Sequence, residues 1–459
     1  MSSSRGENQA PCPGCAELRK ELQKLQGLLE EALKRLAQSE KQLEELGREG
    51  KRQAALFRIP EKKRKEVKAK PGRKKGHKPA FRKPPPTVDE SAEVPLDQCP
   101  NCGGPVHDVK PVEQYILDIP QVKVHCLRLT TYRGNCAHCG EVRSADPRQV
   151  SYATGAAGTH IGRNALAFAA ALNKQYGITM RKTCTILQDW FGLQITPGGL
   201  SQALDRIAGK LHEPFGELVQ QVRNAPAVHA DETGWWLGGR SAWLWVFTNP
   251  QATLYTIDNR SQEVIRRILG DDFPGVLISD CLASYDPHPG RKSKCCSHHL
   301  KAISEALDQA PGSQFLSQVR TLFKASMVWH SMRDEVDPAD YIARVQHLER
   351  DLDRLLAKPR GHHAEMRIRK RLTKQRPHLL TFLHVPGVDP TNNLAERQLR
   401  PAVIARKLSC GNKTANGAAT FEVLTSLAAT CRQQGRSFGQ LVADGLSLTD
   451  RPPPLFDPA

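Results

Sequence analysis

The sequence lacks any apolar run that approaches the roughly 18 residues a membrane-spanning helix needs. Its first fifteen residues, MSSSRGENQAPCPGC, are polar and do not resemble a signal peptide. We therefore expect a cytoplasmic protein with no membrane partner. In a reducing compartment, closely paired cysteines indicate metal binding rather than disulfide bonds.

Acidic residues are also scarce: 48 Asp and Glu stand against 66 Lys and Arg, which gives a net charge of +18. Residues 51–83 alone contain fifteen Lys or Arg and two Glu, and so supply +13 of that charge. A localised basic block is the electrostatic footprint of a polyanion such as DNA. The same composition is typical of a solvated linker. The two interpretations are compatible, and we expect a basic linker over residues 51–95.

At 459 residues the chain is too long for one core and predicts about three domains. Residues 1–50 carry a leucine heptad whose steps alternate between four and three, the seam of a coiled coil. A helix with so narrow a stripe buries little alone, so we expect a homodimer or higher oligomer. The alternative is a stripe that packs on the protein's own body. The seam residues are Leu18, Leu22, Leu25, Leu29, Ala32, Leu36, Ser39, Leu43 and Leu46.

Two cysteine pairs, Cys99/Cys102 and Cys136/Cys139, are each followed by glycine, which is typical of a zinc knuckle. Together they predict a closed, structural Zn²⁺ site in a zinc-ribbon-like module over residues 96–145. Because 33 residues separate the pairs, we expect a β-hairpin between them to bring them together. The competing ligands are His125, Cys126 and His138, and the pair Cys12/Cys15 is half a site that would need a second chain.

Residues 150–222 contain short helical patterns that are broken by Gly and by Pro-Gly-Gly. The pattern is typical of a helix-turn-helix unit that reads DNA. It is equally typical of helices that only pack against one another, and both interpretations stay open.

The hydrophobic period then changes to two, which predicts strands at 226–235, 241–249, 252–259 and 275–280. Asp231 and Asp280 stand at the ends of two of these strands. A long helical region follows, and Glu396 lies in a helix that opens at an Asn-Asn cap.

Asp231, Asp280 and Glu396 are the candidate catalytic and metal-binding residues. Clustered carboxylates repel one another unless a cation lies between them. Mg²⁺, or Mn²⁺ in its place, prefers a few carboxylates together with water and phosphate oxygens. Two such ions can activate the attacking oxygen and stabilise the leaving oxygen of a phosphodiester displacement. The three acids therefore predict metal-dependent chemistry on DNA.

The motifs GRKKGHK, CPNCGG, CAHCG, HADETGWW, ISDCLASYD and NNLAERQLRP occur in this order after the N-terminal heptads. Together they resemble the transposases of the insertion sequence sixty-six family. The resemblance implies a ribonuclease-H-like catalytic domain whose Asp-Asp-Glu triad is Asp231, Asp280 and Glu396. It implies cleavage of element ends and strand transfer to target DNA, in a bacterial cytoplasm and in association with the nucleoid. Double-stranded DNA is the expected partner, and accessory proteins of the same element are a further class of partner.

The expected fold class is multidomain α+β. Its expected parts are a coiled coil (1–50), a basic linker (51–95), a zinc-binding module (96–145), a helical domain (150–222), a ribonuclease-H-like α/β domain (226–325 and 378–430), a helical insertion (326–377) and a C-terminal tail (431–459).

The chain departs from the family pattern at a few positions. Thr391 stands where the family often has Asp, and CCSHHLK stands where it often has Cys-Trp-Ala-His-x-Arg-Arg. The group Cys295, Cys296, His298 and His299 can accordingly be interpreted as metal ligands or as structural residues.

Other side chains near the acids allow two interpretations each. Glu232 follows Asp231 on a strand, so its side chain points to the opposite face and we expect a cap or salt bridge. Trp235 and Trp236 suit either base stacking or the core. Arg397 and Arg400 suit either phosphate binding or a solvated helix face.

Two other functions fit part of the pattern. One is a catalytically inert, zinc-containing DNA-binding regulator, and the intact triad argues against it. The other is a ribonuclease-H-like nuclease without strand transfer, and the heptads and the zinc module argue against it.

Overall fold

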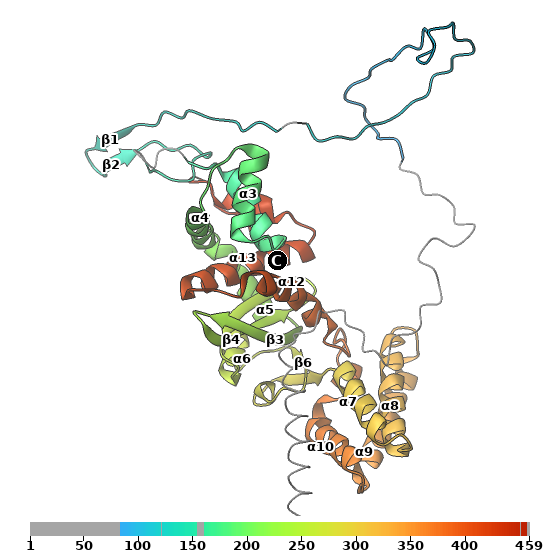
Figure 1. Cartoon of the computed structure of the whole chain (residues 1–459). Helices are drawn as coiled ribbons and strands as arrows, with labels where there is room; N and C mark the ends of the chain where they lie inside the picture. The colour runs from blue at the N-terminus through green and yellow to red at the C-terminus, as the bar shows by residue number, and fades with distance from the viewer. Residues whose placement is uncertain (1–82, 121, 154–159, 450, 457–459) are drawn as a thin grey trace, which may run out of the picture. The chain divides into compact units, whose positions relative to one another are not determined.

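A computed structural model describes residues 83–120, 122–153, 160–449 and 451–456 (Figure 1). The chain divides into two units, Met1–Asp118 and Ile119–Ala459. The expected coiled coil and almost all of the basic block lie outside the described residues, so both remain predictions. Among the described helices, none is long and apolar enough to cross a membrane.

The hairpin in the cysteine-rich region lies elsewhere than expected. Strands β1 (Arg133–Cys136) and β2 (Gly140–Arg143) pair across the second cysteine pair. The described residues of 106–132, between the two pairs, form neither helix nor strand. Their alternating apolar side chains are exposed, with Ile116 at 86%. Alternation alone does not make a stable hairpin, because a sheet needs a layer against which to bury its apolar face.

A five-stranded sheet in the order β5-β4-β3-β6-β7 forms the centre of the second unit. β3, β4 and β5 are antiparallel neighbours, whereas β6 and β7 run parallel to β3. The four predicted strands are confirmed, and β7 was missed because its sequence, RKSK, carries three basic residues. The bounds are β3 (Ala227–Leu237), β4 (Arg240–Thr248), β5 (Thr253–Asp258), β6 (Val276–Ser279) and β7 (Arg291–Lys294).

Helices from both ends of the unit share one apolar cluster with the first face of the sheet. Ala230 of β3 and Phe247 of β4 belong to this cluster. The expected tail is therefore partly core, since α14 packs on α2. The helices are α2 (Arg163–Ala170), which continues as a π-helix (Ala171–Gln175), α3 (Met180–Phe191), α4 (Pro197–Lys210), α5 (His212–Arg223), α6 (Gln262–Leu269) and α14 (Phe438–Gly445).

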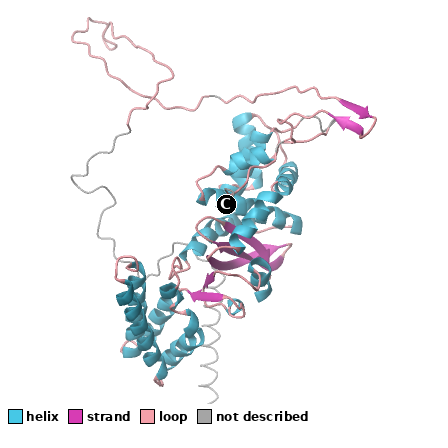
Figure 2. Cartoon of the chain, turned by 180° about the vertical axis from the view of Figure 1, so that it is seen from behind, coloured by secondary structure: helices cyan, strands magenta, loops and turns pink. Residues whose placement is uncertain are grey.

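The other face of β3, β4 and β5 is covered by α12 (Asn393–Ser409) and α13 (Ala415–Gln433). Figure 1 shows both helices beside the sheet, and Figure 2 shows from behind that helices lie next to its strands. Trp235 and Val246 pack here against Leu399 and Ala418. α12 is thereby held directly over the strand that carries Asp231.

Five helices between β7 and α12 form a third apolar cluster with the outer face of β6. α8 runs through residue 326, where the insertion was expected to begin. The shared cluster places the start of this helical region at α7 instead. Its helices are α7 (Cys296–Gln309), α8 (Gln314–Ser331), α9 (Pro338–Ala357), α10 (His363–Gln375) and α11 (Thr381–His384).

Candidate active site

The pairing of β3 with β6 brings Asp231 and Asp280 to the same level of the sheet. The register joins Val228 to Leu277 and His229 to Ile278. Asp231 and Asp280 each lie two residues beyond the last of these pairs. Neighbouring strands are about 4.8 Å apart, so the two acids, 49 positions apart in sequence, come side by side just beyond the pairing of β3 with β6. Asp280 directly follows the end of β6, as expected. Asp231 does not end its strand, because β3 continues in its pairing with β4 as far as Leu237.

Strand alternation assigns the two neighbouring carboxylates to opposite faces. Ala230 belongs to the apolar cluster on the first face, and Trp235 belongs to the cluster below α12. Asp231 has the parity of Trp235 and therefore lies on the α12 face. Glu232 has the parity of Ala230 and points away from it.

Asn392 attaches α12 to the strand of the first acid. It is fully buried at the N-cap position of the helix. Its side chain does not cap the helix but donates to the carbonyl oxygen of Ala230 at 2.8 Å. Its Oδ1 atom lies 3.3 Å from Nδ1 of His229. The start of α12, which carries Glu396 in its first turn, is thus tied to β3 one residue before Asp231.

Electrostatics shows that the three acids interact. Burial raises the pKa of Asp231 to about 7, with further increases from the carboxylates of Glu232, Asp280 and Glu396; a hydrogen bond from the Glu232 N–H opposes them. That hydrogen bond is 2.9 Å long. An isolated surface aspartate would titrate near 4. The negative charge of Asp231 is therefore less favourable than that of an exposed aspartate, and about half of the molecules hold a proton there at neutral pH.

Glu232 makes the salt bridge that its position predicts. Oε1 accepts from Arg260 at 2.7 Å, and Oε2 accepts from the Tyr285 hydroxyl at 2.7 Å. The Arg260 guanidinium lies 3.9 Å from the centre of the Trp243 ring. Both carboxylate oxygens of Glu232 are thus occupied, so it supports the back of the site rather than its open face.

The backbone around Asp280 is held by a buried lysine. Lys294 is fully buried, and its Nζ donates to the carbonyl oxygen of Asp280 at 3.0 Å and to the Ser279 hydroxyl at 3.2 Å. The Asp280 carboxylate accepts from the N–H of Leu282 at 2.8 Å. Together these bonds fix the turn after β6.

The four Cys and His residues at the start of α7 separate into two pairs. Cys296 and His299 are buried, and the His299 ring stacks on Phe323 with ring centres 5.5 Å apart. Cys295 and His298 interact with each other, and His298 also interacts with Asp280 and Glu396. The first pair is structural, and the second pair belongs to the neighbourhood of the acids.

The donor set fits a hard divalent cation. Three carboxylates, one of them with a pKa raised to about 7, provide the charge and the oxygen atoms that Mg²⁺ or Mn²⁺ binds. Within the described ranges from 83 to 456, however, no three His, Cys, Asp or Glu side chains are grouped closely enough to hold a metal ion as they stand. A shared metal ion therefore remains a prediction.

Each of the two cysteine pairs has its own local backbone hydrogen bonds. The backbone N–H of Cys99 donates to the carbonyl of Gly104 at 2.9 Å, and its carbonyl accepts from the N–H of Gly103 at 2.8 Å, so the chain turns around the first pair. Backbone hydrogen bonds from Asn101 and Cys102 lower the pKa of the Cys99 thiol. In the second pair, backbone hydrogen bonds from His138 and Cys139 lower the pKa of Cys136. Low thiol pKa values suit zinc ligands, and a site of all four thiolates remains a prediction.

Among the tryptophans and arginines near the acids, the structure decides the role of one. Trp235 is a core residue, 2% exposed, that packs on Phe421 and donates to Asn412 at 2.9 Å. Trp236 is 52% exposed. Arg397 and Arg400 are exposed on α12. For the second tryptophan and the two arginines, the functional interpretations remain available.

Sequence reasoning missed several residues that support the site. Asn392 was assigned only as a helix cap, although a second Asn beside it was a signal of a further role. Tyr285 lies in the ISDCLASYD motif and so had a local signal. No sequence signal pointed to Arg260 or Lys294, because their partners are remote in sequence.

The fold and the site define a mixed α/β protein with one acid within β3, a second directly after β6 and a third in the first turn of α12. Residues 158–420 match the family model described as Transposase IS66 family. The match covers more than half of the chain, which therefore belongs to the IS66 family of transposases.

Two curated relatives come from Sinorhizobium fredii. The chain is 24% identical over 314 residues to the uncharacterized protein y4qI, a match that covers 59% of this chain and 56% of that protein. It is 32% identical over 98 residues to the uncharacterized protein y4jO, which covers 21% of this chain and 26% of that protein. The chain thus spans about half the length of the first relative and a quarter of the second.

Proposed function

We propose that the protein is a DNA transposase of a bacterial insertion sequence, which cleaves the element ends in a metal-dependent reaction and joins them to target DNA. The observation that carries the proposal is that β3 and β6 pair side by side just before Asp231 and Asp280, and that the carboxylates of Asp280 and Glu396 both raise the pKa of Asp231. The strand order and the α12 cover support a ribonuclease-H-like catalytic domain. Membership of the IS66 family supports the reaction.

In this proposal, Asp231, Asp280 and Glu396 hold Mg²⁺ or Mn²⁺. Ions bound there would activate the attacking oxygen and stabilise the leaving oxygen. The chain itself keeps the acids aligned: strand pairing fixes the first two, and Asn392 fixes the helix of the third.

The two chemical steps balance without an outside energy source. In cleavage, water adds to phosphorus, the bond to the 3′ oxygen breaks and a 3′ hydroxyl is released. In joining, that hydroxyl attacks a target phosphodiester and releases a new 3′ hydroxyl. Arg397 and Arg400, exposed beside Glu396, are positioned on α12 to contact phosphates of the bound DNA.

The other parts of the chain have supporting roles in the proposal. Zn²⁺ bound by Cys99, Cys102, Cys136 and Cys139 would stabilise the N-terminal module. Residues 51–83 would contact the DNA backbone, and the heptads would pair two or more copies of the chain. Accessory proteins of the same element are a further class of partner.

The test uses the full-length chain, Mg²⁺ and a supercoiled plasmid that carries the gene with its natural flanks. We expect nicks at the element boundaries and products joined to a second duplex. Asp231→Asn, Asp280→Asn and Glu396→Gln should each reduce cleavage more than about 100-fold, because direct ligands matter more than their supports. DNA binding should persist in all three. Asp189→Asn, which changes an exposed acid on α3, is the matched control.

The outcomes separate the rival functions. Binding without cleavage by the unaltered protein would support the inert regulator. Cleavage without joining would support a nuclease without strand transfer.

A further inference from the structure

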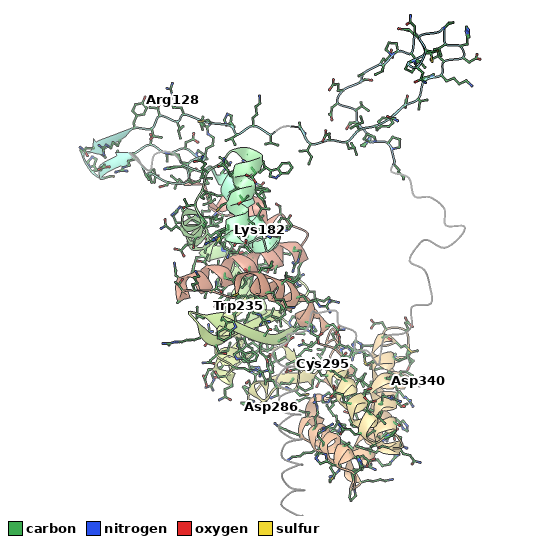
Figure 3. All side chains as sticks on the ribbon, in the orientation of Figure 1. Arg128, Lys182, Trp235, Asp286, Cys295 and Asp340 are labelled. Carbon is green, nitrogen blue, oxygen red and sulfur yellow. The ribbon has the colours of Figure 1, made fainter. Side chains whose placement is uncertain are left out.

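Cys295 contacts the segments that carry two of the three acids. It is fully buried directly before α7, at the place labelled in Figure 3. Its backbone N–H donates to the carbonyl of Ser279 at 2.9 Å, one residue before Asp280. Its Sγ accepts the backbone N–H of Asn392 at 3.2 Å. One side chain and its own backbone therefore link the end of β6 to the start of α12.

The link continues through Asn392 to the third segment. The N–H of Asn392 binds Cys295, and its side chain binds the carbonyl of Ala230, one residue before Asp231. A continuous chain of hydrogen bonds thus runs from β6 through Cys295 and Asn392 to β3. Each of the three acids lies within four residues, along the sequence, of a residue in this series of hydrogen bonds.

His298 interacts electrostatically with the sulfur of Cys295. Burial alone would raise the pKa of the Cys295 thiol, but hydrogen bonds from the His298 side chain and from the backbone of His298 and Asn392 outweigh it and lower that pKa. The hydrogen bond with Cys295 in turn raises the pKa of His298, burial opposes it, and the carboxylates of Asp280 and Glu396 add to the increase. A sulfur with more negative charge is a better acceptor for the Asn392 N–H.

The adjacent cysteine, Cys296, is the first residue of α7 and provides a contrast. Cys296 is equally buried, but it belongs to the apolar cluster of the insertion helices. Burial raises the pKa of its thiol. The two neighbouring thiols therefore differ in surroundings although they share burial and size.

We propose that Cys295 is a positioning residue of the acidic site: it sets the distance between the strand of Asp280 and the helix of Glu396, and His298 acts through its sulfur. This inference rests on the proposed metal-binding role of the acids. Residues that orient metal ligands from behind typically change metal affinity or activity 10–100-fold when they are lost.

Binding of Mn²⁺ to the full-length chain, measured by electron paramagnetic resonance without DNA, tests the inference. Cys295→Ala should weaken Mn²⁺ binding about tenfold. Cys295→Ser should recover most of it, because a hydroxyl oxygen also accepts the Asn392 N–H. Cys296→Ala, the matched control, should stay within about twofold of the unaltered protein even though its melting temperature falls as for any buried cavity.

A double variant tests the part played by His298. If His298 acts through the sulfur, His298→Ala should add little to the effect of Cys295→Ala, since residues that act as one unit are not additive. Full additivity would overturn the pairing. Equal Mn²⁺ affinity of Cys295→Ala and Cys296→Ala would overturn the positioning role.

Plasmid cleavage by the same variants separates this inference from the proposed function. If Mn²⁺ binding depends on Cys295 and the plasmid stays uncut, the transposase proposal fails and the positioning role stands. If the plasmid is cut and Mn²⁺ binding does not depend on Cys295, only the positioning role fails. If the unaltered protein binds no Mn²⁺ at the acids, both fail.

Discussion

At the scale of single residues, Asp231 is the most informative group. Its pKa of about 7 in the folded protein makes the free energy of unfolding depend on pH. The folded state binds this proton more tightly than the unfolded state, whose pKa is near 4. The stabilising effect of the bound proton is present at low pH and is lost as the pH rises to about 7.

We therefore expect Asp231→Asn to melt at a higher temperature than the unaltered protein at pH 8 without added divalent metal. The gain should be on the order of 1–4 kcal/mol and should shrink towards pH 5. Thermal unfolding at several pH values measures it, with Asp189→Asn as the control. If the melting temperatures of Asp231→Asn and of the unaltered protein changed equally with pH, the pKa assigned to Asp231 would be contradicted.

Asn392 carries the second residue-scale prediction. Its removal in Asn392→Ala leaves the carbonyl of Ala230 and the ring of His229 with one partner fewer in a buried place. Such a loss costs about 1–3 kcal/mol. We expect a melting temperature lower by a few degrees and weaker Mg²⁺-dependent cleavage. Asn393→Ala, an exposed neighbour on the same helix, should change neither quantity.

At the scale of elements, the connection between α12 and α13 fixes the far end of the helix over the sheet. Asn412 exchanges backbone hydrogen bonds of 2.9 Å with Trp236 and Gly238 at the end of β3. Gly411 allows this approach with a φ of +92°, and a Cβ atom there would lie 2.4 Å from the carbonyl oxygen of Trp236. Only glycine suits both the φ and the contact.

Gly411→Ala should accordingly destabilise the protein by more than about 2 kcal/mol, since strain of φ and a backbone clash add. Gly435→Ala is the control, because Gly435 has a φ of +68° but no atom within 4 Å of the added Cβ. It should cost about 1 kcal/mol. Chemical unfolding of both variants measures the difference, and equal losses would show that the close contact is unimportant.

The elements also show what the sequence could and could not predict. β3, β4 and β5 followed from alternation and β6 from its fully apolar run, because their apolar side chains pack on helix layers. β7 could not be predicted, because two of its four residues are lysines. Lys292 and Lys294 are buried, and their ammonium groups are satisfied by hydrogen bonds to carbonyl and hydroxyl oxygens. The acids were found through motifs, whereas Cys295 and Asn392 act through contacts that no local pattern reveals.

At the scale of the whole molecule, the predicted zinc module gives a further test. Atomic emission should find one zinc ion bound by Cys99, Cys102, Cys136 and Cys139 in each full-length chain. Cys99→Ser and Cys136→Ser should each lose it, because structural zinc needs all four ligands. Cys126→Ser should retain it. Retention of zinc in Cys136→Ser, with loss in Cys126→Ser, would assign a different ligand set.

The measurement that tests the central claim most directly is anomalous diffraction from Mn²⁺ in crystals of the full-length chain with DNA. The account predicts manganese peaks about 2.1 Å from carboxylate oxygens of Asp231, Asp280 and Glu396, with the ions shared among the three side chains. Manganese bound to one acid alone, or at another place on the chain while the three acids stay free of metal, would contradict it.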